Sequence, residues 1–277
     1  MEIKCILLSS GGLDSLLAEE IIKRQGIQVK IVEFKTPFFG SSEGGVDISD
    51  SFFDILKNPK FGYGKNLNPC IDCKILMLKK AKELMMEKGA DFMATGEVVG
   101  QRPMSQGKDK ILKIEKEAGA EGLVLRPLSA HILPETFPEK NGWVKQKELF
   151  AIEGRSRKEQ MDLAEKFGIE NYPEPSGGCL LTDAGFSLRM KDLMRINLDF
   201  TQNDIELIKS GRFFPIGSGF LVIGRDKNQN ARLMELEKNG DIVFDYTSSP
   251  GPFAILRGDN SIKTRVEAEE IVKRYLG

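Results

Sequence analysis

Near the N-terminus the chain has the sequence Ser10-Gly11-Gly12-Leu13-Asp14-Ser15, directly after a short aliphatic run from Ile3 to Leu8. Two adjacent glycines remove side-chain bulk, so successive backbone N–H groups can face an anion, and Ser10 and Ser15 add hydroxyl donors. A helix that begins near Leu13 points its positive end at the same place. Asp14 offers a carboxylate for the magnesium ion that accompanies a pyrophosphate group. The stretch therefore predicts a phosphate-binding turn, and an ordinary glycine turn is the alternative.

The segments around this turn alternate between strand and helix patterns. Residues 3–8 have the pattern of a buried strand, apolar residues at helical spacing follow from Leu13 to Ile22, and a second aliphatic run covers 29–34. Further helices are predicted at 74–88 and 158–167, and further strands at 90–95 and 123–126. This alternation predicts an open, mostly parallel α/β sheet, which binds its ligands at the carboxyl ends of the strands.

The pattern changes after residue 178. Proline and glycine are concentrated in 172–178, which we interpret as a junction between a domain at 1–178 and a second domain at 179–277. The second part has shorter strand patterns at 219–224 and 241–246 and helix patterns at 203–210 and 266–275. We expect it to be a small α+β domain.

The composition excludes some classes of function. The chain has 277 residues with 40 basic and 41 acidic side chains, so any site for a nucleic acid must be a local patch. The first apolar run is too short for a signal peptide, and no segment approaches the length of a membrane span. We expect a cytoplasmic protein without a membrane partner. In that reducing compartment its four cysteines favour metal binding or redox chemistry over disulfides.

Three of the cysteines are placed for chemistry. The stretch Asn68-Pro69-Cys70-Ile71-Asp72-Cys73 predicts a helix start with Asn68 as N-cap, so that Cys70 and Cys73 share one face of the first turn. A helix N-terminus lowers thiol pKa values and favours thiolates. Cys179 follows Gly177-Gly178 and can fold back toward them, whereas Cys5 lies within a strand and is expected in the core.

The glycine stretch resembles the PP-loop of the ATP pyrophosphatases. This family has the adenine-nucleotide α-hydrolase type of sheet, cleaves ATP between its α and β phosphates and adenylates a carbonyl oxygen. The resemblance assigns Mg-ATP to residues Ser10, Gly11, Gly12, Asp14 and Ser15. It places the adenine near Phe34 and Thr36 and near Thr95 and Gly96.

A wider resemblance is to the tRNA sulfurtransferases. The pattern Asn68-Pro69-x-x-x-Cys73 and the run Ser176-Gly177-Gly178-Cys179 are similar to the two cysteine segments of the tRNA-uridine 2-sulfurtransferases, where the position of Cys70 is often Asp. The run from Thr95 to Gln106 resembles instead a motif of the tRNA 4-thiouridine synthases, as does Arg126-Pro127-Leu128. Within this run we assign Gln101 to nucleotide binding, together with Thr95 and Gly96. These resemblances imply a tRNA substrate and leave open whether the product is a 2- or a 4-thiouridine.

The resemblance implies that a uridine in tRNA is adenylated and that sulfur then displaces AMP at its carbonyl carbon, with Asp14 and the three cysteines as catalytic residues. Two schemes differ in how sulfur is presented. In the one that the three thiols favour, Cys70, Cys73 and Cys179 hold a [4Fe–4S] cluster whose fourth iron binds hydrosulfide. In the other, Cys179 carries a persulfide and Cys73 resolves the resulting disulfide. The sulfur donor is then inorganic sulfide or a persulfide carrier.

The C-terminal part has one further motif. The run from Ser218 to Asn230 resembles the RNA-binding domain of the NFACT proteins, with Arg212, Arg225 and Lys227 for phosphates and Asn228 and Asn230 for hydrogen bonds. A solvated, Asn-rich hairpin is the alternative.

Two other functions stay open at this point. An amide-forming PP-loop ligase needs the same glycine loop but not the three cysteines, and a non-catalytic RNA-binding protein needs only the C-terminal motif.

Overall fold

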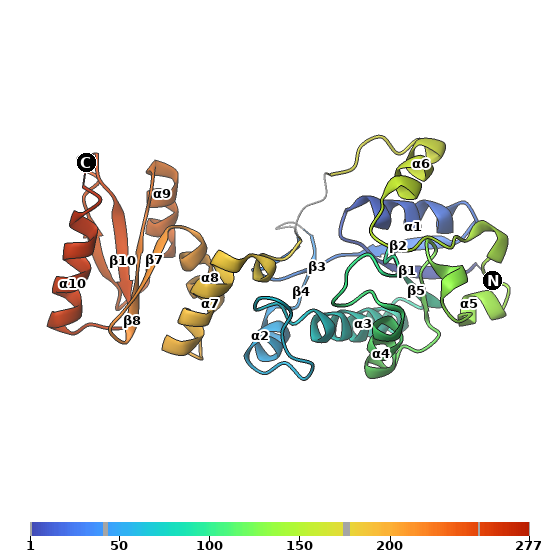
Figure 1. Ribbon diagram of the computed structural model, residues 1–277, viewed down its shortest axis with the longest axis horizontal. Helices are drawn as coiled ribbons and strands as arrows, with labels where there is room; N and C mark the ends of the chain where they lie inside the picture. The colour runs from blue at the N-terminus through green and yellow to red at the C-terminus, as the bar shows by residue number, and fades with distance from the viewer. Residues whose placement is uncertain (1, 41–43, 174–177, 249, 277) are drawn as a thin grey trace. The chain divides into compact units, whose positions relative to one another are not determined.

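The computed structural model describes residues 2–40, 44–173, 178–248 and 250–276, in two compact units, Met1–Cys179 and Leu180–Gly277 (Figure 1). The predicted junction at 172–178 falls partly outside the described residues, including Ser176 and Gly177 of the second cysteine segment. None of the helices in the described ranges combines the length and the apolar character that are needed to cross a membrane.

A parallel sheet of four strands forms the centre of the first unit. Its strands are β2 (Gln28–Val32), β1 (Lys4–Leu8), β5 (Phe92–Thr95) and β6 (Val124–Leu125), in that spatial order, and every neighbouring pair is parallel. The predicted parallel α/β sheet is thus confirmed. Leu8 pairs in register with Val32 and with Thr95, so the segments that follow these strands emerge at one edge of the sheet.

Helices cover both faces of this sheet because its strands are apolar on both sides. One face packs against α1 (Leu13–Lys23) and α6 (Lys158–Phe167), and the other packs against α3 (Cys70–Glu87) and α4 (Lys108–Ala118) (Figure 1). Cys5 and Leu7 belong to the first core cluster and Ile6 and Leu8 to the second, as alternation along a strand requires. Cys5 is fully buried, as expected, and burial raises the pKa of its thiol.

Shorter elements complete the first unit. A small parallel pair joins β3 (Phe34–Lys35) to β4 (Val46–Asp47), and α2 (Ser49–Lys57) follows it. Beyond β6 the chain forms the 3-10 turn η1 (Ala130–Ile132), the short helix α5 (Phe137–Lys140) and the 3-10 turn η2 (Gln146–Glu148). The sequence patterns predicted neither α2 nor α4.

The second unit contains an antiparallel sheet in the order β7 (Arg212–Ile216), β8 (Gly219–Ile223), β10 (Phe253–Arg257), β9 (Ile242–Asp245). It begins with η3 (Leu180–Thr182), and its helices are α7 (Ala184–Ile196), α8 (Gln202–Lys209), α9 (Lys227–Leu236) and α10 (Ile262–Lys273).

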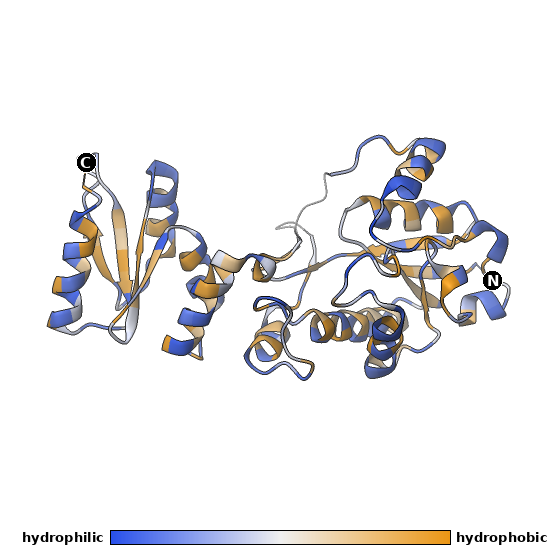
Figure 2. Ribbon diagram, viewed as in Figure 1, coloured by the Kyte–Doolittle hydropathy of each residue, from blue (hydrophilic) through white to orange (hydrophobic). Residues whose placement is uncertain are grey.

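Within this unit, α10 packs Ala268 and Val272 on one face of the sheet, and α9 lies on the other (Figure 1). The two central strands are apolar along their length, and the helices turn hydrophilic residues outward (Figure 2). The core of this unit is therefore built from its own elements.

Candidate functional site

The glycine loop joins β1 to α1. Gly11 has a φ of 69°, in the left-handed region that glycine adopts without strain, and its N–H donates to Ser9 Oγ over 3.1 Å. The Ser10 N–H donates to Ser15 Oγ over 3.2 Å, which closes the loop over the start of the helix. Gly12 is the N-cap of α1 and no side chain caps the helix, so first-turn N–H groups remain available to an anion.

Asp14 lies in the first turn of α1 with a half-satisfied carboxylate. Its Oδ2 accepts a hydrogen bond of 3.0 Å from Gln101 Nε2, which joins two residues that the sequence assigned to nucleotide binding. Its Oδ1 is buried without a hydrogen-bond partner among the described residues. Such an oxygen is costly unless a ligand or cation completes it, and carboxylate oxygens are what magnesium prefers. Asp14 therefore fits the metal of a bound nucleotide.

Gly96 brings the end of β5 against this loop. A Cβ atom at Gly96 would stand 2.4 Å from the backbone carbon and oxygen of Asp14 and 2.6 Å from the nitrogen of Ser15. Thr95, directly before it, is buried and donates its hydroxyl to Glu97 over 3.2 Å. The structure thus places Thr95 and Gly96 beside the glycine loop.

Gln101 belongs to a loop whose backbone is held by two hydrogen bonds. The Gly100 N–H donates to the Gln106 carbonyl oxygen over 2.7 Å, and the Gly154 N–H donates to the Val99 carbonyl oxygen over 2.7 Å. The Oε1 atom of Gln106 is buried without a hydrogen-bond partner in the described part of the chain. The loop therefore presents Gln101 to Asp14 from a fixed backbone.

A chain of buried ion pairs lies next to this loop. Glu97 accepts from Lys74 Nζ over 3.1 Å and from Arg126 Nε over 3.1 Å, and Arg126 Nη1 also pairs with Glu115. Burial opposes ionisation of Glu97, but the two cations outweigh it and lower its pKa to about 2. Glu97 and Arg126 stand in motifs that the sequence singled out. Lys74 and Glu115 carried no signal of their own, because only the fold brings them to these partners.

Cys70 and Cys73 lie in the first turn of α3, as predicted, although the helix start differs in detail. Pro69 and not Asn68 is the N-cap residue, and the Asn68 side chain donates instead to Cys70 Sγ over 3.0 Å. Asp72 accepts from the N–H groups of Lys60 and Phe61, each over 3.0 Å, which ties the preceding loop to the helix.

The three thiols share one neighbourhood. Burial raises the pKa of Cys73, and the neighbouring thiols of Cys179 and Cys70 add to the rise, against the opposing charge of Lys74. Before Cys179 the chain passes close to the loop that contains Gln101. A Cβ atom at Gly178 would stand 3.5 Å from Nη1 of Arg102, which belongs to that loop. The predicted lowering of thiol pKa values was wrong for Cys73, because desolvation outweighs the helix N-terminus.

A preformed metal site is not among the described residues. Within them, no group of three or more His, Cys, Asp or Glu side chains is arranged to hold a metal ion, and no disulfide joins the cysteines. Cys70 Sγ faces the amide of Asn68, and Cys73 Sγ contacts Met77 Sδ at 3.9 Å. As placed, the three thiols do not fit the predicted iron–sulfur cluster, and no step of the reaction proposed below passes through one.

Two of the residues predicted near the adenine, Phe34 and Thr36, have side chains that are engaged within the protein. Phe34 is buried in the core cluster that packs on α3. Thr36 pairs its N–H with the Phe39 carbonyl oxygen over 2.9 Å, and its hydroxyl accepts from the Phe38 N–H over 3.1 Å. Any contact from Phe34 to a nucleotide must therefore use its backbone.

The predicted RNA-binding residues of the second unit divide into two groups. Arg225, Lys227 and Asn228 are exposed around the start of α9, and the Arg212 guanidinium lies 4.6 Å from the centre of the Tyr275 ring. Asn230 is buried: its Nδ2 donates to the Gly251 carbonyl oxygen over 3.2 Å, and its Oδ1 accepts from the Phe253 N–H over 3.0 Å.

The RNA contact expected of Asn230 was therefore wrong, and so was the alternative of an Asn-rich hairpin. The amide of Asn230 stabilises the unit and is not open to RNA, because both of its ends are bound within the protein. The motif also continues as the helix α9, capped by Asp226, whose carboxylate accepts from the Gln229 N–H over 2.9 Å, and not as an Asn-rich hairpin.

Comparison with known proteins gives a partial match. No protein-family model matches the chain. The chain is 34% identical over 131 residues to the tRNA-specific 2-thiouridylase MnmA of Clostridium acetobutylicum, a match that covers 35% of this chain and 36% of that protein. The matched stretch thus spans about a third of the length of this curated relative. Over that part, the chain is similar to a tRNA-specific 2-thiouridylase.

Proposed function

We propose that this chain is an ATP-dependent tRNA sulfurtransferase of the PP-loop type. The observation that carries the proposal is Asp14, whose buried Oδ1 lacks a partner among the described residues at the glycine-rich start of α1. A half-satisfied carboxylate beside free helix amides suits a magnesium-bound pyrophosphate. The partial likeness to a tRNA-specific 2-thiouridylase supports tRNA as the substrate.

The first step is adenylation of a uridine. The loop at 10–15 holds the β and γ phosphates, and the uridine carbonyl oxygen attacks the α phosphorus, so that pyrophosphate leaves. Magnesium, when bound, neutralises charge on the phosphates, and Asp14 holds it while Gln101 keeps the other carboxylate oxygen oriented. Gly96 supports this geometry because it lets β5 approach the loop closely.

The second step is displacement by sulfur, and the thiol neighbourhood supports the persulfide scheme. The terminal sulfur of a persulfide on Cys179 attacks the activated carbon, and AMP leaves with the former carbonyl oxygen. The Cys73 thiol, after losing its proton, then attacks Cys179 Sγ, which releases the thiouridine and leaves a Cys73–Cys179 disulfide. A dithiol reductant and a persulfide donor restore the starting state. The mutual influence of the Cys73 and Cys179 thiols favours this pairing.

The ATP half of the proposal is tested with pyrophosphate release. The variant Asp14→Asn is expected to lose at least about a hundredfold of the tRNA-dependent release of pyrophosphate, as removal of a group that stabilises transition-state charge does. The matched control is Asp50→Asn, an exposed aspartate in the first turn of α2. Equal rates in Asp14→Asn and the control would contradict the assignment.

The sulfur half is tested with cysteine variants and a thionucleoside assay. Cys179→Ala and Cys73→Ala are expected to abolish turnover, and Cys70→Ala is expected to retain it, because the persulfide scheme does not use Cys70. Loss of both activity and bound iron in Cys70→Ala would restore the cluster scheme. Full activity in all three variants would favour an amide-forming enzyme, and no pyrophosphate release with tRNA and a sulfur source would favour a non-catalytic RNA-binding protein.

We assign RNA binding to the exposed start of α9. Arg225 and Lys227 are available there for phosphate contacts and Asn228 for a hydrogen bond. Replacement of both cations by Gln is expected to weaken tRNA binding at low salt and to reduce its salt dependence by about two charges. Unchanged salt dependence in a filter-binding assay would place the tRNA contacts elsewhere.

A further inference from the structure

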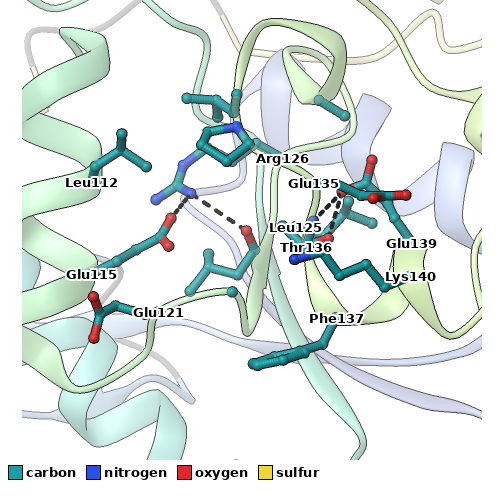
Figure 3. Close-up of a pocket in the computed structure, with 15 residues that line it drawn as sticks. Leu112, Glu115, Glu121, Leu125, Arg126, Glu135, Thr136, Phe137, Glu139 and Lys140 are labelled. Atoms are coloured by element: carbon teal, nitrogen blue, oxygen red, sulfur yellow. Dashed lines mark hydrogen bonds and ion pairs between the residues drawn. The ribbon is translucent and has the colours of Figure 1, made fainter.

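One cavity of the described structure lies apart from the glycine loop and the cysteines. It has a volume of about 420 Å³ and is lined by residues of α4, β6 and α5, at the edge strand of the parallel sheet (Figure 3). None of residues 9–15, and none of the cysteines, lines it. Its volume lies within the range of pockets that hold small molecules.

Arg126 forms part of the cavity wall, and one of its guanidinium N–H groups makes no hydrogen bond within the described residues. The residue is only 2% exposed, its Nε pairs with Glu97, and its Nη1 pairs with Glu115 and with the Val124 carbonyl oxygen. The Nη2 group has no hydrogen-bond partner in the described ranges, and Arg126 lines the cavity (Figure 3). A guanidinium N–H group that is left open to a cavity can donate to a ligand or to an ordered water.

Two buried carboxylates leave one oxygen each for the cavity. Glu139 Oε2 closes the capping box of α5, where it accepts from the Thr136 N–H over 2.8 Å and from the Thr136 hydroxyl over 2.6 Å. Glu115 uses one oxygen for Arg126. The second oxygen of each has no partner within the described residues, and both side chains are less than a tenth exposed. These oxygens accept hydrogen bonds and cannot donate them.

The charges and the apolar side chains of the lining indicate which class of ligand the cavity can bind. It has four acidic residues, Glu115, Glu121, Glu135 and Glu139, against the two cations Arg126 and Lys140, an excess of two negative charges. Leu112, Leu125 and Leu133 supply apolar surface, and the ring of Phe137, which is 47% exposed, lies at the rim. An aromatic face beside carboxylates favours a cation with an apolar body over an anion.

We propose that this cavity binds a small aliphatic amine that also carries a hydroxyl or carbonyl oxygen. The ammonium group donates to the spare oxygen of Glu139, the aliphatic chain lies on the leucines, and the oxygen accepts from Arg126 Nη2. This site is separate from the proposed ATP site, so its test does not depend on tRNA thiolation.

Three probes of equal chain length test the proposal by titration calorimetry on the full chain. They are 5-amino-1-pentanol, 1,5-pentanediol and 5-hydroxypentanoate, which differ only in carrying a positive, a neutral or a negative end. The amino alcohol is expected to bind at least about tenfold more tightly than the diol, because its ammonium group adds charge attraction to the hydrogen bond with the carboxylate. No binding is expected for the carboxylate.

Glu139→Gln is the informative variant, since a Gln at this position still completes a capping box but carries no charge. It is expected to lower the affinity for the amino alcohol about tenfold. Glu148→Gln removes an equally negative side chain that is exposed outside the cavity, and it should leave the affinity unchanged.

A second variant, which fills the cavity with a larger side chain, tests for binding in a protein that still folds. Leu112 is partly exposed on α4, so Leu112→Trp is expected to occupy the cavity and abolish amine binding while thermal melting stays cooperative. The proposal is overturned if the diol binds as tightly as the amino alcohol, if Glu139→Gln binds like the wild type, or if no probe binds the wild-type protein at millimolar concentration.

Discussion

Gly96 stands where two backbones meet, because the end of β5 lies against the start of α1. A Cβ atom there would be 2.4 Å from the backbone of Asp14, a separation that only a shift of one element can relieve. Gly96→Ala is therefore expected to destabilise the protein by about 1–3 kcal/mol and to weaken ATP binding. Urea unfolding and nucleotide titration measure the two effects.

The matched control for this change is Gly107→Ala. The nearest atom to a Cβ at Gly107 is 3.9 Å away at the end of the Lys110 side chain, and its backbone conformation is open to any residue. ATP affinity should stay near the wild-type value, and stability should fall by less than about 1 kcal/mol, because Gly107 is the N-cap of α4, where Ala is less favoured than Gly. An equal loss in the two variants would show that the close contact at Gly96 is unimportant.

Glu97 predicts a dependence of stability on pH. Its pKa is about 2 in the folded protein and about 4.3 in an unfolded chain, so its ionisation stabilises the fold fully above pH 4.3. This contribution, of about 3 kcal/mol, should be lost as the pH falls from 4.3 to about 2. Unfolding free energies measured across this range should fall less steeply in Glu97→Gln than in the wild type.

The same substitution has a cost at neutral pH. Glu97→Gln leaves Arg126 and Lys74 without their shared counter-charge, so a loss of about 3–5 kcal/mol is expected there. Glu148→Gln, an exposed change of equal charge, should keep the wild-type stability and its pH dependence. Identical pH profiles for wild type and Glu97→Gln would contradict the role of this ion-pair chain.

At the scale of elements, α9 contains two asparagines with different roles. Asn230 is buried and structural, and Asn228 is exposed. Asn230 bridges α9 to the start of β10, so Asn230→Ala should destabilise the second unit by about 1–3 kcal/mol. Asn228→Ala should leave stability within about 0.5 kcal/mol and act only on RNA affinity. Chemical unfolding followed by tRNA binding of the folded variants distinguishes the two. A stable Asn230→Ala variant with lost RNA binding would reverse the assignment.

Elements with a strong apolar pattern could be predicted from the sequence, and those stabilised by tertiary contacts could not. The β1 strand ends in three consecutive aliphatic residues, and α6 was predicted at its observed bounds. By contrast, α4 is rich in charged residues and buries only a narrow stripe, and two of the first four residues of α9 are asparagines, which have poor helix propensity. The start of α3 was misplaced by one residue because the Asn68 side chain binds Cys70 and does not cap the helix.

At the scale of the whole molecule, the second unit is expected to fold without the first. Arg257 donates to both oxygens of Asp241 at 2.8 and 2.6 Å and to Asp204 at 2.7 Å, all within this unit. The core between its sheet and α10 is likewise internal. A fragment of residues 180–277 should therefore show one cooperative thermal transition with native-like circular dichroism. A fragment without such a transition would show that the unit depends on the rest of the chain.

The candidate site was predictable where its residues are adjacent in sequence. The loop at 10–15 and the Cys70–Cys73 pair carry their chemistry within single motifs. The orientation of Asp14 by Gln101, the ion pairs of Glu97 and the cavity beside Arg126 join residues that are 11 to 87 positions apart. Such partners are set by the packing of strands and helices, which no local pattern encodes.

The complete burial of Cys5 gives the molecule an internal reporter of global opening. Its thiol is enclosed by the core of the parallel sheet and stays protonated, so alkylating reagents reach it only when β1 separates from its neighbours. Cys70 and Cys179 retain some surface and should react without such opening, whereas the raised pKa of Cys73 should slow its reaction. The rate at which Cys5 is labelled in the native protein thus measures how often the core of the first unit opens. Labelling of the other three thiols reports on the candidate site.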